Sequence, residues 1–205
     1  MNIRSNGGTA WIRVLPVLLL VISSSLAAEK VRPAEWAVPI EVEGVSNLFR
    51  ITPNLYRSAQ PTPRGFRNLE KMGIRTVINL RGGDDDGRAA LEVGFRLEDV
   101  PLSAWRVRHA SNVRILRILG DAERGPVLVH CKHGADRTGM VVALYRMAYQ
   151  GWDRQKAIEE MRKGGYGFHS IYRGLVRHLQ DVDVDALRDQ VMARAIKEPL
   201  ERCPD

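Results

Sequence analysis

A short apolar run that ends in a cysteine-containing loop is the feature that most constrains how this chain folds. The run Val127–Val129 leads into Cys131, and five residues stand between this cysteine and Arg137. A helical pattern follows at once, over residues 138–150, and Gly151 is its expected C-terminal stop. The pattern therefore predicts a strand, a tight loop and an amphipathic helix in immediate succession.

Such a loop suits a reactive thiol and a bound anion. A free thiol is only a few per cent ionised at neutral pH, and cysteines at helix N-termini near cations ionise more readily. The helix start also points N–H groups at the loop. Gly134 lets the backbone curl until successive amides converge on one anion, and Arg137 can hold two phosphate oxygens through paired hydrogen bonds. We therefore expect the loop to bind phosphate.

The complete motif resembles the signature of the cysteine-dependent tyrosine and dual-specificity phosphatases; it reads His130-Cys131-Lys132-His133-Gly134-Ala135-Asp136-Arg137-Thr138-Gly139. The resemblance implies that Cys131 attacks phosphorus and carries a phosphocysteine intermediate, while Arg137 binds the phosphate and stabilises the transition state. It also implies that Thr138 helps to expel the thiolate when the intermediate is hydrolysed. His130, on the far side of the cysteine from the substrate, is implied to adjust the reactivity of that thiolate. The expected phosphate-binding residues are Lys132, His133, Gly134, Ala135, Asp136 and Thr138.

Two earlier segments extend this resemblance; they are Leu55-Tyr56-Arg57-Ser58-Ala59-Gln60-Pro61 and Val77-Ile78-Asn79-Leu80-Arg81. In this order they are similar to bacterial dual-specificity-type phosphatases, above all to periplasmic tyrosine phosphatases that control cyclic-di-GMP signalling and biofilm formation. Plant and fungal phosphatases for inositol pyrophosphates form a second similar group. Arg57 and Arg81 are either further cations on the phosphate side or surface arginines beside strands.

Strand and helix patterns predict an α/β cysteine-phosphatase fold, with a central, mostly parallel sheet flanked by helices and a helix-rich C-terminal half. Strands are expected at 48–51, 55–57, 76–80 and 95–102, and helices at 63–72, 111–119, 138–150, from 153, at 170–179 and at 184–196. The expected organisation is a signal peptide at 1–27, a loosely packed N-terminal leader at 28–46, a phosphatase domain at 47–185, and a C-terminal helix and tail at 186–205.

The first 27 residues indicate a secretory signal peptide. Arg4 and Arg13 form a basic start, residues 14–22 are apolar apart from one proline, and 25–27 place small residues at the cleavage positions. Cleavage after Ala27 would export the mature protein to a bacterial periplasm. An uncleaved membrane anchor is the alternative, although the apolar run is well short of the ~20 residues of a spanning helix.

The chain has two cysteines, Cys131 and Cys203. A phosphocysteine mechanism requires a free Cys131, so we expect Cys203 to be a bystander. A regulatory disulfide between the two is the alternative, because an exported protein meets oxidising conditions.

A net charge of +7 is scattered along the chain rather than striped with aromatic residues, which argues against nucleic-acid binding. Phosphorylated substrates or an anionic membrane surface are the better partners for this charge. No cofactor and no metal site are expected. Asp84–Asp86 form an acidic loop better explained as a solvated turn, and His169 and His178 are expected to be ordinary surface histidines on helices.

The general acid departs from the family pattern. Relatives carry an aspartate near the position of Trp105, but no carboxylate lies between Leu102 and Ala110. The substitutes left open are Asp99, Asp84–Asp86 and Asp136. A missing acid should slow hydrolysis roughly 10²–10⁴-fold, least for acidic leaving groups.

Three functions follow from the sequence. The first is an exported phosphatase for phosphate monoesters, with protein phosphotyrosine as the leading substrate and phosphoserine or phosphothreonine as further candidates. The second is a phosphatase for inositol polyphosphates or phospholipid headgroups, which the Lys132 that follows the cysteine also fits. The third is a catalytically weak phosphate-binding protein, because the acid is absent.

Overall fold

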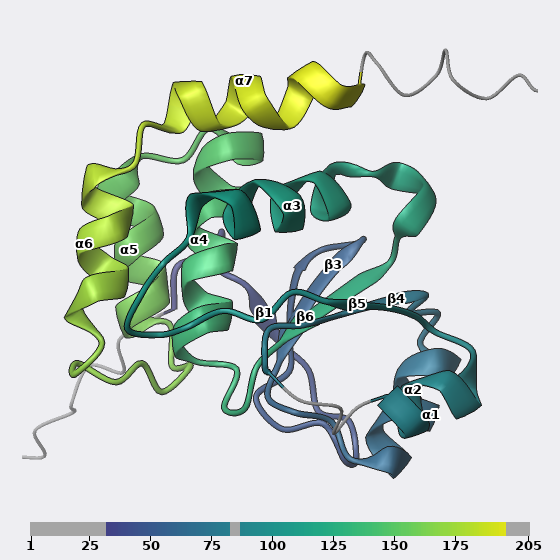
Figure 1. The fold of residues 1–205 in the computed structure, drawn as a ribbon. Helices are drawn as coiled ribbons and strands as arrows, with labels where there is room; N and C mark the ends of the chain where they lie inside the picture. The colour runs from purple at the N-terminus through teal and green to yellow at the C-terminus, as the bar shows by residue number, and fades with distance from the viewer. Residues whose placement is uncertain (1–31, 83–86, 196–205) are drawn as a thin grey trace, which may run out of the picture. The chain divides into compact units, whose positions relative to one another are not determined.

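A six-stranded mixed sheet organises the residues that the computed structural model describes, which are 32–82 and 87–195 (Figure 1). Its order is β1 (Val38–Pro39), β2 (Phe49–Thr52), β3 (Leu55–Ser58), β6 (Val127–His130), β4 (Thr76–Asn79) and β5 (Arg96–Asp99). The last four strands of this order run parallel, and β1 and β2 add an antiparallel edge. The predicted α/β fold with a mostly parallel sheet is confirmed.

The two central strands, β4 and β6, are buried along their whole length. Their β-branched, apolar residues are typical of parallel strands covered on both faces. The register places Ser58, Asn79 and His130 side by side at the carboxyl ends of β3, β4 and β6. Loops that follow these strands therefore meet at one edge of the sheet, where ligands bind in open α/β folds.

Helices cover both faces of the sheet. One face packs on α1 (Pro63–Lys71) and α2 (Gly87–Val93). The other face carries α3 (His109–Gly120), α4 (Asp136–Gln150), α5 (Arg154–Lys163), α6 (Arg173–Asp181) and α7 (Val184–Ala195), as Figure 1 shows. A 3₁₀ turn, η1 (Ala122–Arg124), precedes β6.

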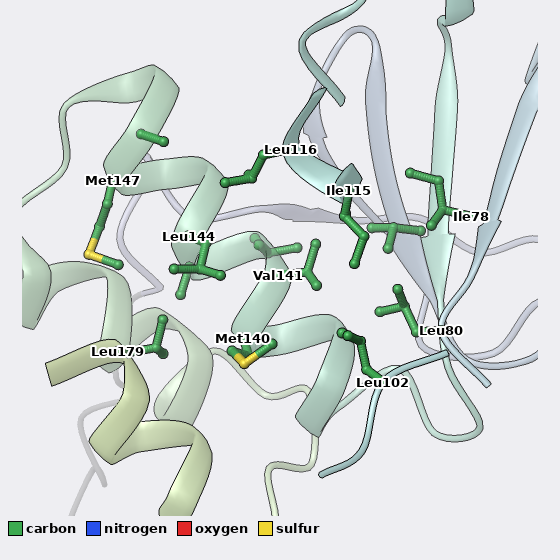
Figure 2. Close-up of a cluster of buried hydrophobic side chains, with 14 of the residues drawn as sticks. Ile78, Leu80, Leu102, Ile115, Leu116, Met140, Val141, Leu144, Met147 and Leu179 are labelled. Atoms are coloured by element: carbon green, nitrogen blue, oxygen red, sulfur yellow. The ribbon is translucent and has the colours of Figure 1, made fainter. Parts of the chain in front are cut away.

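Helix α4 lies at the centre of the larger core. Val141 faces Ile115 of α3 and the sheet, whereas Met140 and Leu144 lie on the side of α4 toward Leu179 of α6 (Figure 2). Most of α4 is buried, because α3, α5, α6 and α7 all contact it. The expectation of an amphipathic helix with one buried stripe is therefore wrong, and α4 holds its loop from the interior of the protein.

The predicted helix boundaries agree where side chains encode them. Thr62 caps α1 by accepting from the Gly65 N–H at 3.1 Å, and Asp153 caps α5. Gly151 ends α4 at φ +64°, a left-handed conformation that favours glycine. Helix α2 was not predicted, and α6 begins at Arg173 rather than at 170.

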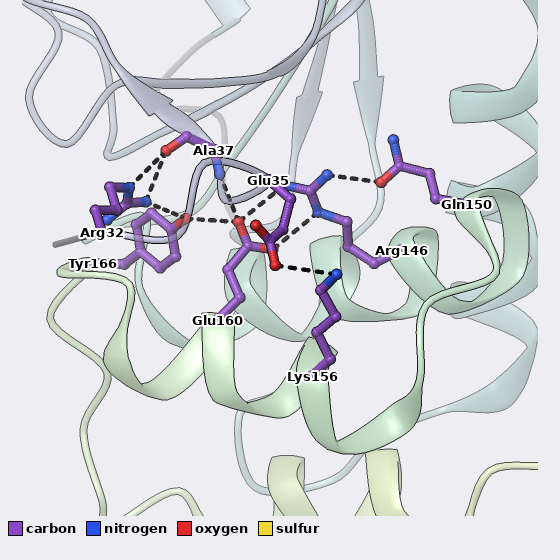
Figure 3. A network of polar contacts seen from close by, with 8 residues as sticks. All are labelled: Arg32, Glu35, Ala37, Arg146, Gln150, Lys156, Glu160 and Tyr166. Carbon is purple, nitrogen blue, oxygen red and sulfur yellow. Dashed lines mark hydrogen bonds and ion pairs between the residues drawn. The ribbon is translucent and has the colours of Figure 1, made fainter.

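The N-terminal segment that the sequence assigned to a loose leader is anchored at Arg32 and Ala37, although most residues between them and Gly44 are exposed or half-buried. Ala37 is buried, and its N–H donates to Glu160 Oε1 at 2.7 Å. Arg32 donates to the Ala37 carbonyl and to the Tyr166 hydroxyl, and Glu160 also accepts from Arg146 (Figure 3). The expectation of loose packing is wrong at these two residues, because hydrogen bonds to Tyr166 and to the buried Glu160 hold them in place. The predicted signal peptide lies outside the described residues.

Candidate active site

Cys131 stands between the end of β6 and the start of α4, as predicted. The Leu80 N–H donates to the His130 carbonyl at 2.9 Å, and Arg137 Nη1 donates to the Leu80 carbonyl at 3.0 Å. The guanidinium of Arg137 therefore curls back beside the residue that precedes the cysteine. Cys131 itself is 2% exposed, whereas its neighbour Lys132 is exposed, so the loop folds around the sulfur.

Four successive carbonyls of the loop point away from its centre. Each accepts a hydrogen bond from outside the loop: Lys132 O from Gln60 N (3.3 Å), His133 O from Asn47 Nδ2 (2.8 Å), and Gly134 O and Ala135 O from Arg57 Nη2 (2.6 and 3.5 Å). A peptide N–H points opposite to the C=O of the same peptide unit. The N–H groups of residues 133–136 therefore turn inward and form an anion nest.

Gly134 is required by both its conformation and its surroundings. Its φ is +69°, which L side chains rarely adopt. A Cβ added there would lie 2.5 Å from the carbonyl oxygen of Ser58 and from the nitrogen of Ala59. The end of β3 thus presses on the loop, and only glycine allows that approach.

Arg57 is neither a surface arginine nor a cation on the phosphate side. It is completely buried beneath the loop, where its guanidinium lies 3.6 Å from the centre of the Tyr166 ring. Its Nε and Nη1 atoms have no hydrogen-bond partner within the described residues. Burial lowers the pKa of Arg57, while electrostatic interactions with Tyr166, Glu160 and Cys131 act in the opposite direction. Arg57 is thus a buried cation that lies close enough to Cys131 to interact with it electrostatically.

His130 is buried and carries no charge near neutral pH. Burial lowers its pKa to about 4; a hydrogen bond with the backbone of Cys131 acts in the opposite direction, and the cations Arg81 and Arg137 lower it further. The imidazole therefore acts on Cys131 as a neutral hydrogen-bonding group. Arg81 donates to Gln60 Oε1 at 2.6 Å, and this contact joins the two segments of the predicted motif.

Thr138 lies in the first turn of α4 and is completely buried. Its hydroxyl has no hydrogen-bond partner among the described residues. Of the other predicted phosphate-binding residues, Lys132 and His133 are exposed, and Gly134, Ala135 and Asp136 are buried. The structure thus brings the whole predicted set into one loop at the start of α4.

The candidates for the general acid are engaged elsewhere or lie outside the described residues. Asp99 Oδ1 accepts from Asn79 Nδ2 at 3.0 Å. Asp136 uses both oxygens on His169, whose backbone N–H lies 2.8 Å away and whose Nδ1 lies 2.9 Å away. Asp84–Asp86 lie outside the described residues. In the loop after β5, Trp105 is 67% exposed and stacks edge-on against Tyr172 at 5.0 Å.

His169 differs from its prediction as a surface histidine on a helix. It lies in the loop before α6, paired with Asp136 and with its ring centroid 5.6 Å from that of His133. Asn47, Gln60 and His169 were missed as residues of the site. Only the position of Gln60 in a family-like segment signalled it, because these contacts join parts of the chain that are distant in sequence.

Comparison with known proteins gives the same picture. Residues 43–174 match the family model described as "DSP-PTPase phosphatase fused to NAD+ Kinase". The dual specificity protein phosphatase TpbA of Pseudomonas aeruginosa strain UCBPP-PA14 is 40% identical over 187 residues, which cover 87% of this chain and 84% of the relative. Inositol diphosphatase DSP3 of Arabidopsis thaliana is 28% identical and covers 58% of this chain and 62% of its own.

Solved structures agree in fold. The crystal structure of P. aeruginosa TpbA has a TM-score of 0.71 at 40% identity and covers 78% of this chain and 99% of its own. A cysteine-to-serine variant of TpbA, solved in complex with phosphotyrosine, has the same TM-score at 39% identity, with 78% and 98% coverage. The sequence motif, the anion nest and these relatives lead to one conclusion: the chain belongs to the family of tyrosine and dual-specificity protein phosphatases.

Proposed function

We propose that this protein hydrolyses phosphate monoesters, phosphotyrosine of proteins first among them, through a phosphocysteine intermediate on Cys131. The thiolate forms a bond to phosphorus while the bond from phosphorus to the leaving oxygen breaks. Water then attacks the phosphocysteine, releases inorganic phosphate and restores the thiolate. The observation that carries the proposal is the anion nest, in which four carbonyls turn outward and the N–H groups turn in around Cys131.

Charge supports the same chemistry. Arg137 reaches back to the Leu80 carbonyl, close to the strand end that presents Cys131. Such a fork fits two equatorial oxygens of a phosphoryl group, whose charge grows toward the leaving group in the transition state. Beneath the loop, the buried groups Arg57, Arg146 and Glu160 sum to one positive charge, which an ionised Cys131 balances.

The substrate is proposed from the relatives. The TpbA variant bound to phosphotyrosine favours an aryl phosphate, and the exposed Trp105 offers an aromatic surface beside Tyr172. An inositol phosphate is the second candidate, because the Arabidopsis relative is an inositol diphosphatase and Lys132 is an exposed cation on the loop. Hydrolysis rates for phosphotyrosine peptides and for inositol pyrophosphates, compared on the same preparation, decide between them.

The mechanism is tested with para-nitrophenyl phosphate and acid-quenched mass spectrometry. We expect turnover that resists EDTA and a phosphate adduct on Cys131. Both should vanish in Cys131→Ser, whereas Cys203→Ser is the matched control and should keep both. Equal hydrolysis by Cys131→Ser would rule out the phosphocysteine, and the absence of turnover by the unsubstituted chain would leave a phosphate-binding protein as the function.

We further propose that the chain is exported to the periplasm after cleavage behind Ala27. The support is the basic, apolar and small-residue order of residues 1–27. No helix within 32–82 or 87–195 is long and apolar enough to cross a membrane. N-terminal sequencing of protein from a periplasmic extract should begin at residue 28, and an intact N-terminus in the membrane fraction would instead indicate an anchor.

A further inference from the structure

Three potential metal ligands gather at the edge of the phosphate loop. His133 and Asp136 belong to the loop itself, and His169 comes from the segment before α6. One ligand atom from each of the three lies within 4.8 Å of the other two. The side chain of Asp136 is 8% exposed and that of His169 is 49% exposed, so the group reaches from the protein interior to solvent.

Two imidazoles and one carboxylate form a donor set that suits zinc. Zn²⁺ binds histidine nitrogen at roughly 2.0–2.1 Å and carboxylate oxygen at roughly 2.0–2.2 Å, so neighbouring ligands in a tetrahedral site lie about 3.3 Å apart. Asp136 and His169 already approach to 2.9 Å. His133 is exposed, and its nearest ligand atom lies within 4.8 Å of those of Asp136 and His169.

We propose that His133, Asp136 and His169 bind one divalent transition-metal ion of the zinc class, and that this ion inhibits the enzyme. Bound zinc takes the place of the hydrogen bond between Asp136 Oδ2 and His169 Nδ1, and it ties the phosphate loop to the loop before α6. It also fixes His133 across the rim of the anion nest. The binding claim stands on the three ligands alone, whereas the inhibition rests on the phosphatase function proposed above.

The binding test must separate this site from the thiols, because thiolates also bind zinc. The untagged full-length chain with Cys131→Ser and Cys203→Ser supplies a background without cysteine. Isothermal titration with ZnCl₂ should give one ion per chain in this background. Adding His169→Ala or His133→Gln should weaken binding at least about tenfold, since even the loss of outer partners costs roughly 10–100-fold.

His109→Gln is the matched control, because His109 is an exposed histidine on α3 outside the cluster and pairs with Gln190. It should bind zinc like the background. Thermal unfolding without metal shows whether each variant is folded, and His133→Gln provides a second route if His169→Ala is unstable. The proposed site would be overturned if the background without cysteine did not bind zinc. It would also be overturned if both histidine variants bound zinc with the affinity of that background.

The activity test uses the cysteine-containing enzyme. Zinc should inhibit hydrolysis of para-nitrophenyl phosphate, and excess EDTA should restore the rate. In His169→Ala, the zinc concentration that halves the rate should rise about tenfold or more. An unchanged value there would refute inhibition through this site, whereas an inactive enzyme that still binds zinc would contradict the phosphatase function and leave the metal site intact.

Discussion

A single arginine, Arg57, supports the phosphate loop from the protein interior. Its guanidinium is completely buried, donates to the carbonyls of Gly134 and Ala135, and lies against the Tyr166 ring. A buried charge of this kind is costly unless other charges balance it. In this protein Glu160 supplies a negative charge near Arg57, and Cys131 also interacts with it electrostatically.

Arg57→Met should therefore lower kcat/KM for aryl phosphates by roughly 10²-fold, because displacement of a catalytic loop by about 1 Å has that effect. Arg50→Met, at an exposed position on β2, is the matched control and should keep the kcat/KM of the unsubstituted chain. A variant of Arg57 that folds and keeps its kcat/KM would show that this guanidinium is not needed to hold the loop.

His130 makes stability depend on pH in a defined window. Its pKa is about 4 in the folded chain, below the ordinary value of 6.5. Between these values the unfolded state takes up a proton that the folded state refuses. The free energy of unfolding should thus fall by roughly 3 kcal/mol from this group as pH drops from 6.5 to 4.

Urea denaturation at several pH values measures this effect. In His130→Asn, whose amide does not titrate, the free energy of unfolding should depend less on pH between 6.5 and 4. The difference between the two chains separates the contribution of His130 from that of the carboxylates. Parallel curves for both chains would show that His130 takes up no proton in this range.

At the scale of elements, the phosphate loop rests on a chain of contacts that begins far from it. Arg32 contacts Tyr166, and Tyr166 donates to Glu160 at 3.0 Å (Figure 3). Tyr166 also stacks on Arg57 under the loop. Burial raises the pKa of Tyr166 to about 12, so it remains a neutral donor. The segment from Arg32, helix α5 and strand β3 thus support the loop together.

Glu160→Gln should cost about 3–5 kcal/mol of stability, because it leaves the buried Arg146 without its countercharge. Glu159→Gln is the matched control one residue away, where an exposed carboxylate pairs with Lys163. Its effect should stay below about 1 kcal/mol. Thermal or chemical unfolding measures both, and equal losses would argue against the buried network.

The sequence predicted elements whose signals are local. Thr62 and Asp153 marked helix starts, and Gly151 marked the end of α4 by the left-handed turn it adopts. Contacts between distant segments were not predictable in this way. Arg57 has the same local sequence whether it faces solvent or lies under the loop, and His169 meets Asp136 only after α5 has returned the chain to the site.

At the scale of the whole molecule, the loop after β5 carries an exposed Trp105 where the family resemblance led us to expect an acid. Both oxygens of Asp136 accept from His169, and Oδ1 of Asp99 accepts from Asn79, so both carboxylates are already engaged in hydrogen bonds. The protein should therefore favour esters whose oxygen leaves without help.

A series of aryl phosphates tests this expectation. The kcat should rise steeply as the phenol becomes more acidic, by roughly 10²-fold between poor and good leaving groups, which is the contribution a general acid normally makes. Ala104→Asp, beside Trp105, restores a carboxylate to the loop and should flatten the dependence. A flat dependence in the unsubstituted chain would reveal an acid at another position.

The contacts that Arg32 and Ala37 make with Tyr166 and Glu160 also limit how many N-terminal residues can be removed. If the proposed leader is cut after Ala27, four residues remain before Arg32, and the hydrogen bonds of Arg32 and Ala37 are retained. Removal of ten further residues would delete both Arg32 and Ala37. It should weaken the support of the phosphate loop although no residue of that loop is changed. Two forms that differed only at their amino termini in this way would then differ in activity.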